Sequence, residues 1–144
     1  MSYLAERRVE EKERRRAEMV DAAEELYAAV GWDDVTMERV AKSARLSRAL
    51  LYVYFRDKND LLLAITERAL LELRERFVAA AAAHPLGIDQ VQAIGRAYVQ
   101  FQQEKPYRFD ACSRFHAHQT AGESADDACA AASDAVMTVI VKAL

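Results

Sequence analysis

Glycine, proline and cysteine are scarce in this chain of 144 residues, which has four, two and two of them. Because glycine and proline interrupt helices and concentrate in turns, their scarcity indicates an all-helical protein. The two cysteines, Cys112 and Cys129, show no paired spacing, which is typical of a reducing cytoplasm. Nothing resembles a signal peptide or a run of about 20 apolar residues, so we expect a cytoplasmic protein that does not enter a membrane.

Residues 35–58 contain two short segments with helical periodicity, joined by a tight turn. Thr36 is placed to cap the first segment, and Ser47 is placed to cap the second. In the second segment, Leu51 and Phe55 are four residues apart and are expected to face inward. Two short amphipathic helices joined in this way are typical of a helix-turn-helix.

The second of these helices, residues 48–55, is predicted to present an outer face to DNA. Residues 35–58 carry six basic and two acidic side chains, a local balance of +4, whereas the whole chain has a formal charge of −3. Positive charge concentrated on an acidic protein is typical of a surface that meets phosphate. An exposed helix fits the major groove, and its first turn, here Arg48, is where recognition helices contact base edges.

Residues 36–61, TMERVAKSARLSRALLYVYFRDKNDL, resemble the DNA-binding head of the TetR family of transcriptional regulators. The most specific part is the closing pattern L-Y-x-Y/H-F-x-x-K-x-x-L. The resemblance implies that Tyr52 contacts the DNA backbone or bases, and that Arg48 often contacts bases. It also implies that Lys58 and Thr36 approach phosphates.

The sequence departs from the family pattern at two positions. Arg45 stands where glycine is usual, so it must adopt a left-handed or adjusted conformation at a cost of roughly 1 kcal/mol. Leu50 replaces a small, usually polar residue, and it could either meet a thymine methyl group or weaken binding. The predicted DNA-binding residues are Thr36, Arg45, Ser47, Arg48, Ala49, Leu50, Tyr52, Val53, Tyr54 and Lys58.

The resemblance also implies an architecture and partners. We expect a polar extension over residues 1–14, a DNA-binding domain over 15–63 and a helical effector-binding body over 64–144. The function implied is a regulator, most often a repressor, that binds a pseudo-palindromic operator as a homodimer and is released by a small-molecule effector. Family bodies usually continue for two further helices that form a dimeric four-helix bundle, so this body is expected to be incomplete or to dimerise differently.

Apolar periodicity predicts the remaining helices. Mixed charges over residues 1–16 favour a solvated helical extension, with a basic arm on phosphates or the minor groove as the alternative. An amphipathic helix should follow from Arg15 to Val30 and stop at Gly31. Further helices are predicted from Asp57 to about residue 83, from about 89 to 104, from Pro106 onward, and from Ser124, which with Asp127 forms a cap, to the end, with residues 121–123 as a loop.

The predicted body contains aromatic and soft side chains at helical spacing, most of which should form its core. Small-molecule pockets combine aromatic walls with a few polar groups, and family analogy favours such a pocket here. If a pocket exists, Tyr98, Phe101, Phe115 and His116 are the residues expected to line it. No cofactor is implied.

Two other functions are compatible with the sequence. One is an interaction module that keeps the helical head without binding DNA, which Arg45, Leu50 and the acidic first helix favour slightly. The other is an enzyme or metal sensor built on Cys112, His116 and His118, because a Cys–His pair can act as nucleophile and base or as two metal ligands. Diagnostic spacing for further ligands is lacking, so we expect neither an enzyme nor a metal site.

Overall fold

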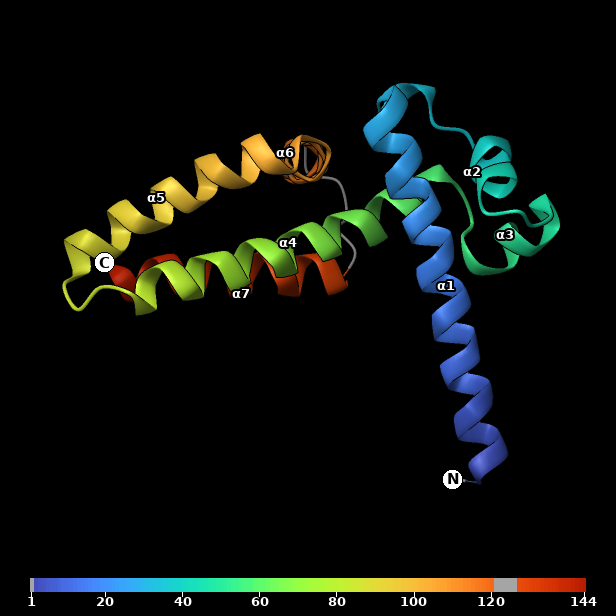
Figure 1. The fold of residues 1–144 in the computed structure, drawn as a ribbon, viewed down its shortest axis with the longest axis horizontal. Helices are drawn as coiled ribbons and strands as arrows, with labels where there is room; N and C mark the ends of the chain where they lie inside the picture. The colour runs from blue at the N-terminus through green and yellow to red at the C-terminus, as the bar shows by residue number, and fades with distance from the viewer. Residues whose placement is uncertain (1, 121–126) are drawn as a thin grey trace. The chain divides into compact units, whose positions relative to one another are not determined.

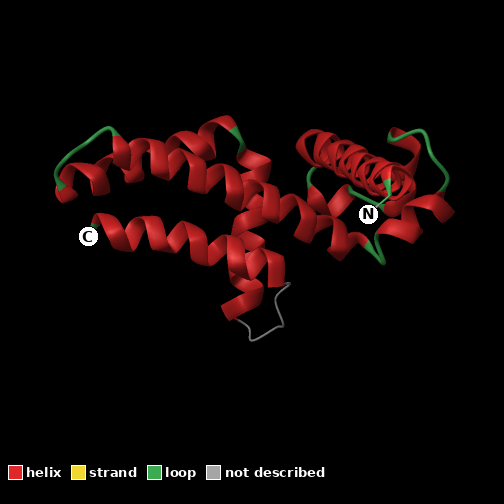
Figure 2. Cartoon of the chain, turned by 90° about the horizontal axis from the view of Figure 1, so that it is seen from below, coloured by secondary structure: helices red, strands yellow, loops and turns green. Residues whose placement is uncertain are grey.

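The computed structural model describes residues 2–120 and 127–144, in which helices are joined by loops and no strand is present (Figure 2). The predicted all-helical fold is confirmed. The chain divides into two compact units, Met1–Leu61 and Leu62–Leu144, which are described separately. None of the helices in the described residues combines the length and hydropathy that a membrane span requires.

The first unit begins with the long helix α1, Tyr3–Val30, which extends well past the two short helices of this unit (Figure 1). The Ser2 hydroxyl accepts a hydrogen bond from the Ala5 amide and caps its start. Almost all side chains before residue 17 are exposed, and Arg15 forms an ion pair with Glu11 at 3.3 Å. The predicted extension is therefore helical and continuous with the amphipathic helix that follows.

Gly31 ends α1 as predicted, with a φ of 80° that a residue with a Cβ atom rarely adopts. A short 3₁₀ helix, Trp32–Asp34, follows, and the Trp32 ring lies 5.0 Å from the Tyr27 ring. The later half of α1 packs against α2, Met37–Ser43, and α2 packs against α3, Arg48–Tyr54. The core of this unit includes Met19, Val20, Ala23, Tyr27, Trp32, Val35, Met37, Val40, Ala41, Leu51, Phe55 and Leu61.

The helix α4, Lys58–Ala82, begins in the first unit and continues in the second. The second unit also contains α5, Gly87–Glu104, α6, Pro106–Thr120, and α7, Asp127–Ala143. The predicted helices agree with these bounds, except that α5 starts two residues early, because the Leu86 carbonyl already accepts the Gln90 amide at 3.0 Å. The predicted cap at Ser124 and the predicted loop at 121–123 lie outside the described residues.

The core of the second unit lies among its four helices. Figure 1 shows α5 returning alongside α4, while α7 runs beside α4 and ends near the start of α5. At that end, a Cβ atom on Gly87 would lie 2.9 Å from the Ala143 carbonyl oxygen, so glycine permits the close approach. The main cluster of buried residues contains Ala69, Leu70, Leu73, Phe77, Ile94, Phe101, Cys112, Phe115, Cys129, Ala132, Val136 and Ala143.

Candidate nucleic-acid interface

The turn between α2 and α3 is built from backbone hydrogen bonds and one left-handed residue. The Thr36 hydroxyl caps α2 by accepting the Arg39 amide at 3.2 Å. After α2, the Leu46 amide donates to the Ala41 carbonyl, and Arg45 has a φ of 58°. Of the two conformations predicted for Arg45, left-handed or adjusted, the structure has the left-handed one. This conformation turns the chain between α2 and α3.

The helix α3 is held by its inner face. The Ser47 hydroxyl caps it by accepting the Leu50 amide at 3.1 Å. Leu51 is fully buried and Phe55, at its C-cap, is 2% exposed. Because a helix of seven residues is not stable in isolation, this packing is what keeps it formed.

The outer face of α3 is open to solvent. Arg48, Ala49, Tyr52 and Val53 are all exposed, and Val53 is 74% exposed although it is apolar. Leu50 and Tyr54 are half-buried at the edges of this face. These six residues, which we call the α3 face, are all the residues of this helix that were predicted to contact DNA. Leu51, the remaining residue of the helix, was predicted and found to face inward.

Two cation–π contacts involve Phe55 and Lys58, which follow α3 in the chain. The Arg16 guanidinium of α1 lies 5.2 Å from the Phe55 ring centroid, and the Lys58 ammonium lies 4.9 Å from the Trp32 ring centroid. Such contacts contribute about 0.5–1 kcal/mol at exposed sites. Sequence reasoning missed both, because each joins segments that are distant along the chain. The half-buried Lys58 side chain is therefore positioned by an aromatic ring at the start of α4.

An ion pair in the turn into α4 neutralises one of the basic side chains of residues 35–58. Arg56 donates to both carboxylate oxygens of Asp60, from Nε at 3.0 Å and from Nη2 at 3.1 Å. The hydrogen bond from Arg56 is the main reason that the pKa of Asp60 lies below its usual value. The Asp57 carboxylate caps α4 by accepting the Asp60 amide at 3.0 Å. The i, i+4 spacing of Arg56 and Asp60 was visible in the sequence and was overlooked.

Other basic residues near the α3 face are less constrained. The Arg39 guanidinium donates to the Asp34 carbonyl at 2.8 Å. Lys42, Arg45 and Arg48 are exposed, and their side chains have no carboxylate partner within residues 2–120 and 127–144. Three exposed cations at or beside α3 can therefore contact phosphates without first breaking an ion pair.

The second unit contains a cavity of about 360 Å³ lined by side chains from all four of its helices, which we call the four-helix cavity. Tyr98 and His116 line it, as predicted for an effector pocket. Phe101 and Phe115 are not among the residues that line this cavity. Phe101 is fully buried, with the Arg76 guanidinium 5.5 Å from its ring centroid, and Phe115 is a core residue. Both point inward, but into the packed core.

The four-helix cavity offers little reactive chemistry. Cys112 lies in its lining, and burial raises the pKa of the thiol to about 12, so the thiolate needed for a nucleophile or a metal ligand is strongly disfavoured. Among the described residues, no three side chains of His, Cys, Asp or Glu lie close enough together to hold a metal ion. The geometry therefore gives the alternative built on Cys112, His116 and His118 no support.

Comparisons with known proteins agree with the geometry of the first unit. Residues 19–65 match the family model described as bacterial regulatory proteins, tetR family. The chain is 33% identical over 109 residues to the HTH-type transcriptional regulator BetI of Rhizobium meliloti, covering 76% of this chain and 54% of that protein. An uncharacterised HTH-type transcriptional regulator of Mycobacterium tuberculosis is 36% identical over 101 residues, covering 68% of this chain and 43% of that protein. The chain thus spans about half the length of these curated relatives.

Solved structures extend the likeness to both units. A TetR-family transcriptional regulator from Streptomyces coelicolor superposes with a TM-score of 0.65 at 30% identity, covering 91% of this chain and 56% of that chain. A TetR-family regulator from Marinobacter aquaeolei superposes with a TM-score of 0.69 over 93% of this chain and 68% of that one, and at 19% identity it supports the fold alone. The helix-turn-helix, the family match and these relatives lead to one conclusion: residues 19–65 of the chain form a helix-turn-helix domain of the TetR family of bacterial regulatory proteins.

Proposed function

We propose that this protein is a sequence-specific DNA-binding transcriptional regulator that acts without catalysis or a cofactor. The observation that carries the proposal is the α3 face, an exposed surface of arginine, tyrosine and small apolar side chains on a helix whose opposite side is buried. A helix of this kind fits the major groove, where each base pair has a distinct pattern of donors and acceptors.

The residues of the α3 face and its surroundings would divide into two groups. Arg48, in the first turn, and Tyr54 would contact base edges, and Leu50 would meet a thymine methyl group. Thr36, Tyr52 and Lys58 would contact phosphates and fix the register of the helix on the duplex. Ser47, Ala49, Val53 and Arg45 complete the predicted contact surface.

The regulator would act as a homodimer on a pseudo-palindromic operator. Two α3 helices would enter successive major grooves, with half-site centres about 34–36 Å apart or a little more. Domain roles would follow the predicted division, with DNA contacts from residues 15–63 and effector binding and dimerisation from 64–144.

A small-molecule effector would bind in the four-helix cavity and release a repressor from its operator. No acidic, lysine or arginine side chain lines this cavity, whereas Tyr98, His116 and Ser133 supply neutral polar groups. Because an unpaired charge is costly to bury, the effector would be an uncharged, largely apolar molecule. Its effect on DNA affinity cannot exceed the difference between its affinities for the two states.

The proposal can be tested by selecting preferred DNA duplexes from a random pool. The affinity of the protein for the selected sequence is then measured. Affinity for DNA should fall steeply as salt is added. In a plot of the logarithm of the binding constant against the logarithm of the salt concentration, each neutralised phosphate contributes about −0.9 to the slope. Arg48→Ala should cost roughly 1–3 kcal/mol and relax the preference at one base position. Lys58→Ala should weaken binding equally to all sequences and reduce the salt slope.

The matched control is Arg96→Ala, which removes an exposed arginine from α5 in the second unit. It should leave affinity and sequence preference almost unchanged. If the protein binds no duplex even at low salt, the interaction module becomes the better explanation. If Arg48→Ala leaves the selected sequence intact, α3 does not contact bases in the way proposed.

A further inference from the structure

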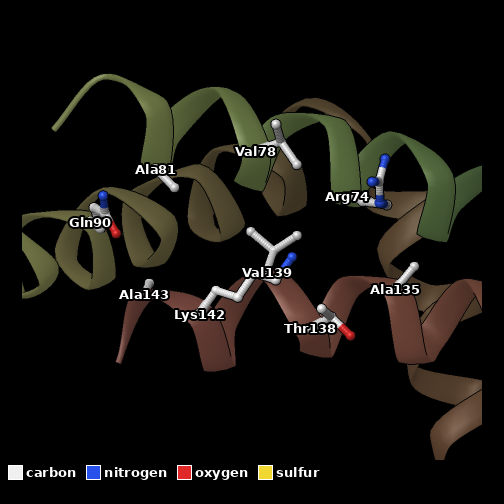
Figure 3. Close-up of a pocket in the computed structure, with 9 residues that line it drawn as sticks. All are labelled: Arg74, Val78, Ala81, Gln90, Ala135, Thr138, Val139, Lys142 and Ala143. Atoms are coloured by element: carbon white, nitrogen blue, oxygen red, sulfur yellow. The ribbon is translucent and has the colours of Figure 1, made fainter. Parts of the chain in front are cut away.

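A second hollow in the Leu62–Leu144 unit lies between α4 and α7 and has a volume of about 350 Å³ (Figure 3). We call it the α4–α7 groove. It shares no lining residue with the four-helix cavity. It also differs in charge, since two of its lining side chains, Arg74 and Lys142, are basic and none is acidic. The two hollows are therefore suited to different classes of ligand.

The walls of the α4–α7 groove are apolar along its length. Val78 and Ala81 on α4 face Val139 on α7 across the groove (Figure 3). Val78 is 43% exposed, so apolar surface is available to a ligand. Burial of hydrocarbon against such walls is favourable by roughly 0.8 kcal/mol for each CH₂ group.

The neutral hydrogen-bond donors that line the groove already have acceptors. The Gln90 side-chain amide donates to the His84 carbonyl at 2.8 Å, and the Thr138 hydroxyl donates to the Asp134 carbonyl at 2.9 Å. The charged donors available to a ligand are the Arg74 guanidinium and the Lys142 ammonium, both exposed.

Neither cation has a carboxylate partner among the described residues of the chain. The Lys142 side chain runs along the groove toward Val139, and Arg74 lies at the other end (Figure 3). A ligand in this groove that presents an acceptor can therefore pair with either cation, and a negative charge is favoured over a neutral oxygen because hydrogen bonds between charged groups are stronger.

We propose that the α4–α7 groove is a binding site for a small carboxylic acid with an apolar stem, of the size of a medium-chain fatty acid. The carboxylate pairs with Arg74 or Lys142, and the stem lies against Val78, Ala81 and Val139. This site is independent of the proposed effector in the four-helix cavity, and the inference does not require DNA binding.

Titration of the full chain with three probes tests the site, with backbone amide shifts as the readout. Octanoate supplies charge and stem, octanol supplies the stem alone, and acetate supplies the charge alone. Octanoate should saturate and shift amides around Val78 and Val139, with octanol and acetate each at least about tenfold weaker.

Variants identify the groups responsible. Arg74→Gln combined with Lys142→Gln should raise the octanoate dissociation constant about tenfold or more while leaving octanol binding unchanged. Arg96→Gln, which removes a cation outside both hollows, should leave octanoate binding unchanged. Because all three side chains are exposed, the variants are expected to fold, and thermal unfolding checks this.

Three results would overturn the proposal. The first is that octanoate does not bind. The second is that removing either charge has no effect, so that octanol binds as tightly as octanoate or the double variant binds octanoate like the original chain. The third is that the shifted amides belong to the four-helix cavity around Tyr98 and Cys112 instead of the α4–α7 groove.

Discussion

Replacing Arg45 with glycine should stabilise the first unit, because Arg45 has a φ of 58°. A left-handed conformation costs a residue with a Cβ atom roughly 1–2 kcal/mol, and glycine avoids this cost. Glycine also has more conformational freedom in the unfolded chain, which removes about 0.4–1 kcal/mol of the gain. The net effect is a stabilisation of roughly 0.5–1 kcal/mol, or a rise in melting temperature of about 2–8 °C for a unit of this size.

Unfolding of the first unit can be followed by tryptophan fluorescence, because Trp32 is the single tryptophan of the chain and is buried in this unit. Arg45→Ala is the matched control, since it removes the same charge and keeps a Cβ atom in the left-handed conformation. Arg45→Gly should therefore be more stable than both the original chain and Arg45→Ala. Equal stability of the two variants would show that the strain assigned to this turn is absent.

Two further predictions concern the second unit and the turn into α4. Gly87→Ala should destabilise the second unit by roughly 1–3 kcal/mol, because the new Cβ atom would lie 2.9 Å from a backbone carbonyl oxygen at the end of α7. Gly95→Ala, where nothing lies within 4 Å of the added atom, should be neutral or stabilising in thermal unfolding, and similar losses at both positions would contradict the packing argument. Because the pKa of Asp60 is lower in the folded protein, its ion pair stabilises the fold above the usual carboxyl pKa, and this contribution is lost as the pH falls below about 4. In urea unfolding, the free energy of unfolding of Asp60→Asn should therefore depend less on pH near pH 4 than that of the original chain. If it depends on pH equally in both proteins, the ion pair of Asp60 does not contribute in the way proposed.

The helix-turn-helix could be predicted from the sequence because its determinants are local. Thr36 and Ser47 cap helices through amides three residues away, and Leu51 and Phe55 share a face through helical spacing alone. The left-handed conformation of Arg45 was predictable from the family pattern, in which glycine occupies this position. Such features depend on residues within one or two helical turns, and the sequence contains all of that information.

Contacts between distant segments were not predictable in the same way. The pairing of Arg16 with Phe55 and of Lys58 with Trp32 depends on how the helices of the first unit pack, which spacing does not specify. The same limit applies to Phe101, which was predicted to line a pocket and is fully buried. Periodicity identifies a side chain that points inward, but core and cavity are both inward, and only the packed structure separates them.

The contact between Lys58 and Trp32 links the stability of the first unit to the proposed binding of phosphate. An ammonium group 4.9 Å from a ring centroid keeps part of its hydration and its three donors, so it can bind a phosphate without leaving the ring. Because the ring restricts the otherwise flexible lysine stem, less conformational entropy is lost when a phosphate binds. Trp32 is buried against α1, and α1 also packs against α2, which presents Thr36 at its start. The two proposed phosphate contacts are therefore held by a single helix, and a change in the packing of α1 would displace both of them together.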